Sequence, residues 1–135
     1  MSQAQASYKT QGLDGFGVIE SSNTYVALRL PIPPSANRYW RSYNGKVVVS
    51  EEAQQYKWQV KLLCGQLDPF PGNVSLTISI YRARKSGDLD NYLKVALDSL
   101  KGILYPDDNA VVEIHALRHD DKDNPCMVLQ ARRVR

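Results

Sequence analysis

The alternation of apolar and polar residues from Val74 to Tyr81 constrains the fold more than any other feature of this sequence. Val74, Leu76, Ile78 and Ile80 alternate with serine, threonine and tyrosine, which gives an extended strand one apolar and one polar face. A strand of this kind has to join a sheet whose apolar face is covered by other elements. We therefore predict a layered fold in which helices cover one face of a sheet.

Other segments supply the partners for this strand. Residues 24–31 alternate in the same way before a proline-rich stretch, and the dipeptide Asn44-Gly45 is typical of a tight hairpin turn. Ser50, followed by two glutamates, indicates the start of a helix. The predicted elements that remain are a helix from about residue 51 to 67, a helix from about 89 to 101, a strand over 110–117, and its hairpin partner over 127–132.

The resulting order is β-α-β-α-β-β, and 135 residues are about one domain's worth of chain. We therefore predict an α+β fold: a single domain over residues 24–135, with a mixed sheet of about four strands and two main helices packed on one face. Residues 1–23 are rich in Gln, Ser and Gly and lack periodicity. They are predicted to form a flexible N-terminal extension.

The composition limits the classes of function. A net charge of +3 and a pI near 8.9 permit an anionic partner without requiring one. No apolar run approaches the roughly 18 residues that a membrane span needs, and no signal peptide pattern is present. Cys64 and Cys126 form no C-x-x-C pair, which favours reduced thiols over a disulfide. We expect a cytoplasmic protein that does not bind membranes.

A short acidic motif is the candidate site. Asp88 and Asp90 flank Leu89, and in an extended backbone their carboxylates point the same way. Magnesium prefers oxygen ligands and needs only one or two carboxylates beside a substrate phosphate. A second acidic pair, Asp107 and Asp108, follows the predicted helix. The pattern favours a Mg²⁺ site for cutting nucleic acid, with Mn²⁺ as a substitute. The structural alternative is that one Asp caps the helix and the other is an exposed charge.

Cations gather before the acidic motif and in an earlier loop. The earlier loop interleaves cations with aromatic rings, an arrangement suited to phosphates and bases, although Tyr39 and Trp40 could instead cap the core. The residues predicted to bind DNA are Arg38, Arg41, Lys46, Arg82, Arg84 and Lys85.

Three segments together resemble the signatures of the RusA family of Holliday junction resolvases. They are residues 30–39 (LPIPPSANRY), residues 88–100 (DLDNYLKVALDSL) and residues 107–112 (DDNAVV). The resemblance implies a small, homodimeric, magnesium-dependent endonuclease, often prophage-borne, in a bacterial or phage-infected cell. Such an enzyme resolves four-way DNA junctions by paired symmetric nicks in recombination and repair.

The resemblance also implies roles for individual residues. Asp88, Asp90 and Asp108 match the metal-binding acids of the family, and Lys94 matches its catalytic lysine, so these four carry catalysis. Supporting positions of the same motifs are Asn91, Asp98 and Asp107. The basic loop of residues 82–87 is less arginine-dense than in the founding member, which affects DNA affinity and sequence preference more than chemistry.

Two other functions remain open at this level. One is a magnesium nuclease that prefers other branched DNA, such as flaps or replication forks. The other is a junction-binding protein that is catalytically silent, although intact Asp88, Asp90, Lys94 and Asp108 argue against it. Cleavage assays on a four-way junction, a fork and a linear duplex separate these classes.

Overall fold

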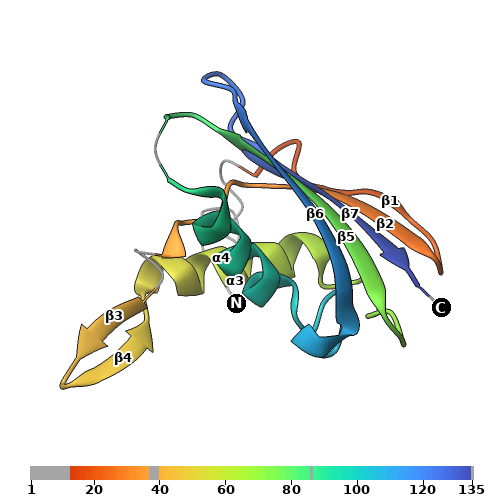
Figure 1. The fold of residues 1–135 in the computed structure, drawn as a ribbon, viewed down its shortest axis with the longest axis horizontal. Helices are drawn as coiled ribbons and strands as arrows, with labels where there is room; N and C mark the ends of the chain where they lie inside the picture. Colours follow the sequence, from red (N-terminus) through yellow and green to blue (C-terminus); the bar gives the residue numbers. More distant parts are fainter. Residues whose placement is uncertain (1–12, 37–39, 86, 135) are drawn as a thin grey trace, which may run out of the picture.

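The structure is a computed structural model that describes residues 13–36, 40–85 and 87–134. Four strands precede the first helix, α3, and two consecutive strands follow η1 at the end of the chain (Figure 1). Their bounds are β1 Gly17–Ser21, β2 Tyr25–Leu30, β3 Trp40–Tyr43, β4 Lys46–Val49, α3 Glu51–Cys64, β5 Val74–Arg82, α4 Leu89–Leu100, the 3₁₀ helix η1 Asp108–Ala110, β6 Val111–Asp120 and β7 Cys126–Arg133.

A mixed five-stranded sheet forms one layer, in the order β1-β2-β7-β5-β6. Only β5 and β6 run parallel, while the other neighbours are antiparallel. Figure 1 shows α3 and α4 together on one face of this sheet. The predicted α+β class, the mixed sheet and the two helices on one face are therefore confirmed.

The sheet has one strand more than the sequence predicted. The additional strand is β1, which pairs with β2 from Gly17 to Ser21 and lies in the segment that we expected to be a flexible extension. Glycine and serine gave this segment little strand signal, so its order comes from pairing with the neighbouring strand. The part of the predicted extension over residues 1–12 lies outside the described residues.

The partner of the last strand also differs from the prediction. We expected residues 127–132 to form a hairpin with the strand before them, but β7 lies between β2 and β5, and within the described residues β6 pairs only with β5. Because α4 connects β5 to β6, these two strands run parallel and side by side. The turn after β6 then carries the chain past β5. The apolar residues of β7, including Met127 and Leu129, thereby reach the centre of the sheet.

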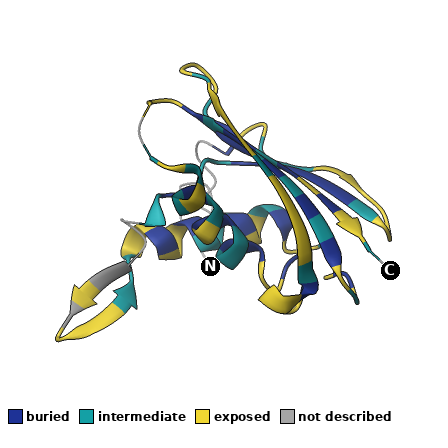
Figure 2. Cartoon of the chain, in the orientation of Figure 1, coloured by how far each residue is buried: buried dark blue, intermediate teal, exposed yellow. Residues whose placement is uncertain are grey.

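The core lies between the sheet and the two helices. Leu76, Ile78 and Ile80 of β5 are fully buried on the helix-facing side, and Figure 2 shows further buried residues on β7 and β2, whereas β6 is mostly exposed. On α4, Tyr92 and Val95 are buried whereas Leu93 and Leu97 are only half-buried.

Local signals at the ends of elements agree with the structure. The Ser50 side chain accepts a hydrogen bond from the Ala53 amide and caps α3. Asn44 and Gly45 have φ angles of 51° and 77°, the left-handed values of the predicted tight turn between β3 and β4. This hairpin projects from the body of the protein (Figure 1).

Two further observations concern the cysteines and the helices. Cys64 and Cys126 are both buried free thiols, as predicted. Across the described residues, no helix has the length and apolar character required to cross a membrane.

Candidate active site

The first acid of the motif lies at the start of α4. Asp88 occupies the N-cap position with an extended backbone (φ −82°, ψ 149°), and its carbonyl accepts the Asn91 amide at 3.1 Å. Its side chain makes no capping hydrogen bond, unlike that of Ser50. The alternative in which Asp88 serves only as a helix cap therefore does not fit, and its carboxylate remains available for another ligand.

A cleft of about 450 Å³ opens beside the middle of α4. Lys94, Asp98 and Asp108 line it together, with Tyr105 and Val111 forming part of its apolar wall. Partial burial raises the pKa of Asp98, the nearby Asp108 carboxylate raises it further, and Lys101 opposes the shift. Because both side chains line this cleft, Asp98 and Asp108 lie close together. The chain therefore comes back to the side of α4 at Asp108.

The two groups of acids lie at different levels of α4. Asp90 and Asp98 are eight residues apart, which is about 12 Å along a helix. Within residues 13–36, 40–85 and 87–134, no three His, Cys, Asp or Glu side chains come close enough together to hold a metal ion. The predicted set of Asp88, Asp90 and Asp108 is therefore not gathered within one copy of the chain, and its role as a metal site stays a prediction.

The supporting acids already have local partners. The Asp107 side chain accepts the Asp108 amide at 2.7 Å, which caps η1, and it lies 3.6 Å from the Lys101 ammonium. Asp98 forms an ion pair of 2.7 Å with Lys57 of α3. Asn91 is half-buried in the first turn of α4. These contacts give Asp107 a structural role and couple Asp98 to the packing of the two helices.

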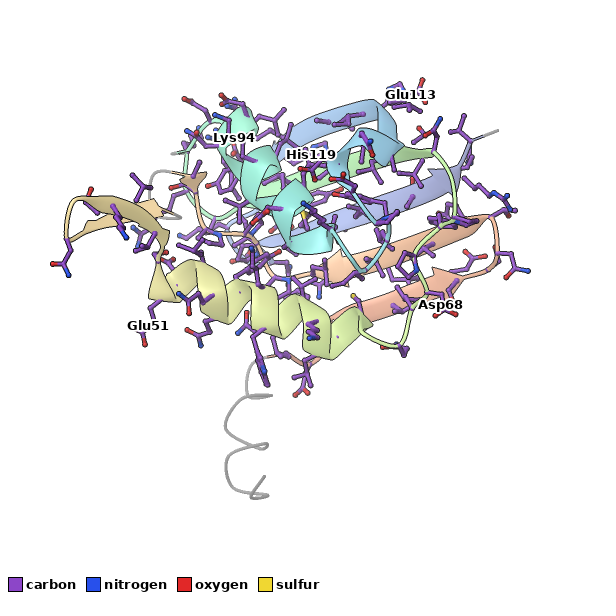
Figure 3. All side chains as sticks on the ribbon, turned by 90° about the horizontal axis from the view of Figure 1, so that it is seen from below. Glu51, Asp68, Lys94, Glu113 and His119 are labelled. Carbon is purple, nitrogen blue, oxygen red and sulfur yellow. The ribbon has the colours of Figure 1, made fainter. Side chains whose placement is uncertain are left out.

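The cations predicted to bind DNA differ in accessibility. Arg84 and Lys85 are exposed in the loop before Asp88, and Lys46 is exposed on β4. Figure 3 shows Lys94 on α4 at the same end of the molecule as Glu51, where α3 follows the hairpin. Arg38 lies outside the described residues, and the backbone of Arg41 is described without its side chain.

Among the predicted DNA-binding cations whose side chains are described, Arg82 differs from the others in its burial. It is only 7% exposed, and its guanidinium donates hydrogen bonds to the Asp120 carboxylate and to the Gly87 carbonyl. A buried guanidinium that is already paired has little capacity left for a phosphate in solvent. The contacts thus argue against the predicted DNA-binding role of Arg82.

Sequence patterns missed Tyr105 as a residue of the site. Its ring is fully buried, its hydroxyl donates to the Leu97 carbonyl at 2.6 Å, and it lines the cleft together with Asp98 and Asp108. Burial raises its pKa, and the two carboxylates add to the shift. The only signal was an aromatic residue at the end of the apolar run Ile103–Tyr105. Such a pattern is as typical of an ordinary core as it is of a functional site.

One comparison with known protein families covers both acidic segments and Lys94. A family model described as endodeoxyribonuclease RusA matches residues 31–129. The crossover junction endodeoxyribonuclease RusA of Escherichia coli (strain K12) is 37% identical over 101 residues, which span 71% of this chain and 83% of that protein. The corresponding protein of Enterobacteria phage HK97 is 37% identical over 76 residues, 53% of this chain and 62% of the relative. The chain therefore belongs to the RusA family of endodeoxyribonucleases, enzymes that hydrolyse DNA.

Proposed function

We propose that this enzyme resolves four-way DNA junctions by magnesium-dependent paired nicks, acting as a homodimer in recombination and repair. The observation that carries the proposal is the Asp88 carboxylate, which makes no capping hydrogen bond and lies two residues before Asp90 at the start of α4. Relatives named as crossover junction endodeoxyribonucleases support the substrate. Because these relatives come from a bacterium and a phage, we place the reaction in the cytoplasm of a bacterial or phage-infected cell.

The donor set suits a hard divalent cation. Asp88, Asp90 and Asp108 are exposed carboxylates, and Mg²⁺ takes oxygen ligands of this kind together with water and substrate phosphate. These three residues would hold Mg²⁺, with Mn²⁺ as a substitute. When bound, the ion supplies a water of lowered pKa and a positive charge beside the phosphate.

Lys94 has a separate task in the cleft. Its ammonium is a compact point charge on a flexible stem, and it lines the same cleft as Asp98 and Asp108. We assign it to a non-bridging phosphate oxygen, where it offsets negative charge that develops as water attacks the phosphorus. The nick should leave a 5′-phosphate. Arg84, Lys85 and Lys46 extend the contact with DNA from the cleft to the loop and the hairpin.

The free edge of the sheet supports a dimer. Strand β6 is ten residues long and is hydrogen-bonded only to β5 in the described part of the chain. Its apolar side chains Val112, Ile114 and Leu117 are 52%, 41% and 45% exposed. Long edge strands with exposed apolar residues are usually covered. A second copy of the chain, pairing antiparallel along β6 about a two-fold axis, would cover this edge.

Such pairing would also bring the separated acids together. The start of β6 follows Asp108, while its end at Asp120 is tied through Arg82 to Gly87, next to Asp88. In an antiparallel pair the start of one strand lies opposite the end of the other. Asp108 of one copy would then lie near Asp88 and Asp90 of the other. The arrangement gives two sites, as two symmetric nicks require.

Cleavage of defined DNA structures tests the proposal. Asp90→Asn should abolish magnesium-dependent nicking of a four-way junction and leave junction binding intact or tighter, because it removes negative charge near the phosphates. Glu20→Gln is the matched control, since Glu20 is exposed on β1 at the opposite edge of the sheet from β6, and it should cut normally.

A fork and a linear duplex of the same sequence complete the assay. Faster cutting of the fork than of the junction would favour the alternative branched substrate. Binding without any magnesium-dependent product would favour a silent junction-binding protein. If Asp90→Asn cut the four-way junction normally in magnesium, the proposed site would be wrong.

A further inference from the structure

Arg82 is a cation whose side chain is almost completely buried. It is the last residue of β5, and its side chain is 8% exposed. Withdrawing a guanidinium from water is costly unless a counter-charge and further hydrogen-bond acceptors meet it. The hydrogen-bond partners of Arg82 therefore indicate the role of this buried side chain.

These partners come from two other segments. The Nε atom donates to the Asp120 carboxylate at 2.5 Å, at the end of β6, and Nη1 donates to the Gly87 carbonyl at 3.1 Å. The Arg82 backbone carbonyl also accepts the Asp121 amide at 2.9 Å. One residue thus joins the ends of the two parallel strands to the turn that leads into α4.

Gly87 is also close to a side chain of α4. Its φ angle of +88° lies in the left-handed region, and a Cβ atom there would stand 2.6 Å from the Tyr92 hydroxyl oxygen and 2.9 Å from its Cζ atom. The Tyr92 ring is buried one turn into α4. Gly87 therefore lies close to both the Arg82 guanidinium and the Tyr92 ring, and the next residue is Asp88.

We propose that Arg82 is a positioning residue whose guanidinium, forked between Asp120 and Gly87, fixes the backbone before Asp88 and so sets the place of the Asp88 carboxylate for metal binding. The inference rests on the proposed function of Asp88. The fork needs two donors at fixed angles, which a guanidinium provides and an ammonium does not. Arg84 and Lys85, both exposed in the same loop, are left to contact DNA.

A purely structural role for Arg82 makes a different prediction. If the Arg82 to Asp120 pair only stabilised the sheet, its loss would lower the melting temperature and leave the folded protein with its normal affinity for metal. Partners in the outer shell of a metal site, in contrast, typically change metal affinity by about 10- to 100-fold. Metal affinity and thermal stability are therefore the two quantities to compare.

The experiment uses full-length protein and Mn²⁺ as the probe, with free Mn²⁺ measured by electron paramagnetic resonance. Arg82→Lys keeps a positive charge beside Asp120 but loses the fork, and Arg82→Gln loses both. Asp120→Asn keeps an acceptor for Nε and is the variant to use if either change at Arg82 prevents folding. Arg132→Gln, at an exposed position on β7, is the matched control. Melting temperature and the magnesium dependence of junction cleavage are measured on the same samples.

The expected result separates affinity from stability. Arg82→Lys should bind Mn²⁺ about tenfold more weakly, melt within a few degrees of wild type, and recover its cleavage rate at saturating magnesium. Arg82→Gln should be weaker in both metal affinity and stability, and Asp120→Asn should weaken Mn²⁺ binding to a smaller extent. The control should match wild type in every measurement.

Other results would overturn the inference in distinguishable ways. If wild type binds Mn²⁺ and Asp88→Asn does not, but the Arg82 and Asp120 variants retain full Mn²⁺ affinity, the positioning role is wrong and the proposed function stands. If Asp88→Asn binds Mn²⁺ and cuts as wild type does, the proposed function fails and the role of Arg82 fails with it.

Discussion

Asp88 occupies the position of a helix-capping residue, but its side chain does not cap the helix. Aspartate before an apolar helix usually accepts backbone amides, yet this side chain makes no capping hydrogen bond. Its neighbour Gly87 adopts a backbone conformation that is strained for other residues and packs against Tyr92. The contacts of Gly87 therefore fix the turn before α4, and the Asp88 carboxylate stays available for another ligand.

At the same scale, the partner of Arg82 predicts a pH dependence of stability. The hydrogen bond from Arg82 lowers the pKa of Asp120. A carboxyl group whose pKa is lower in the folded state stabilises the protein above its unfolded pKa, and this stabilisation is lost as pH falls through the folded pKa. The melting temperature of wild type should therefore exceed that of Asp120→Asn above about pH 5, and the gap should close as pH falls below about 4.

Thermal melts of the two proteins from neutral to strongly acidic pH check this expectation. Arg82→Gln serves as the control background, because without the guanidinium the change Asp120→Asn should have a smaller effect on the melting temperature at every pH. A gap between wild type and Asp120→Asn that stayed constant across the whole range would show that ionisation of Asp120 does not contribute to stability.

At the scale of elements, the two helices begin in opposite ways. Helix α3 starts at a serine whose side chain accepts the Ala53 amide at 3.2 Å, with Glu51 and Glu52 in its first turn. Helix α4 starts at Asp88, where no side-chain cap forms. The capped start of α3 stabilises that helix. At the start of α4, the Asp88 side chain does not cap the helix, and it lies at the N-terminus, where backbone amides favour negative charge.

This contrast predicts different costs for removing the two side chains. Ser50→Ala should lower the free energy of unfolding by about 1 kcal/mol and the melting temperature by about 2–4 °C, because the Ala53 amide loses its acceptor. Ser50→Asp should retain most of the stability, since aspartate also caps well. Asp88→Ala should cost less than Ser50→Ala in denaturant titrations. A larger loss at Asp88 would mean that its carboxylate does cap the helix in solution.

At the scale of the whole molecule, the arrangement of the acids predicts complementation between two inactive subunits. If Asp108 of one copy completes the site of the other, a heterodimer of Asp90→Asn and Asp108→Asn has one site with both changes and one site with neither. It should nick a cruciform plasmid at about half of the wild-type rate, and it should give nicked circles instead of linear product.

Differently tagged subunits allow this heterodimer to be purified free of both homodimers. Each homodimer should be inactive, since every one of its sites lacks one acid. A heterodimer as inactive as the homodimers would place all three acids of a site on the same chain. Leu117→Lys on β6 provides an independent check, because it should shift the protein toward monomer in sedimentation measurements if β6 forms the interface.

The sequence by itself determined the elements whose signals are local. The alternation in β5, the Ser50 cap of α3, the Asn44-Gly45 turn and the helix after Asp88 each depend on residues within a few positions of one another. The same holds for the motif of Asp88, Asp90 and Lys94, which pointed to the chemistry and to the family.

Only the tertiary structure decided which segments meet. The sequence did not place β7 between β2 and β5, bury Arg82 against Asp120, or set Tyr105 beside Asp98 and Asp108. It also did not reveal that Asp108 returns to the middle of α4, away from its first turn. These contacts join residues that are distant in the chain. Their free energy depends on how whole elements pack, which no local pattern records.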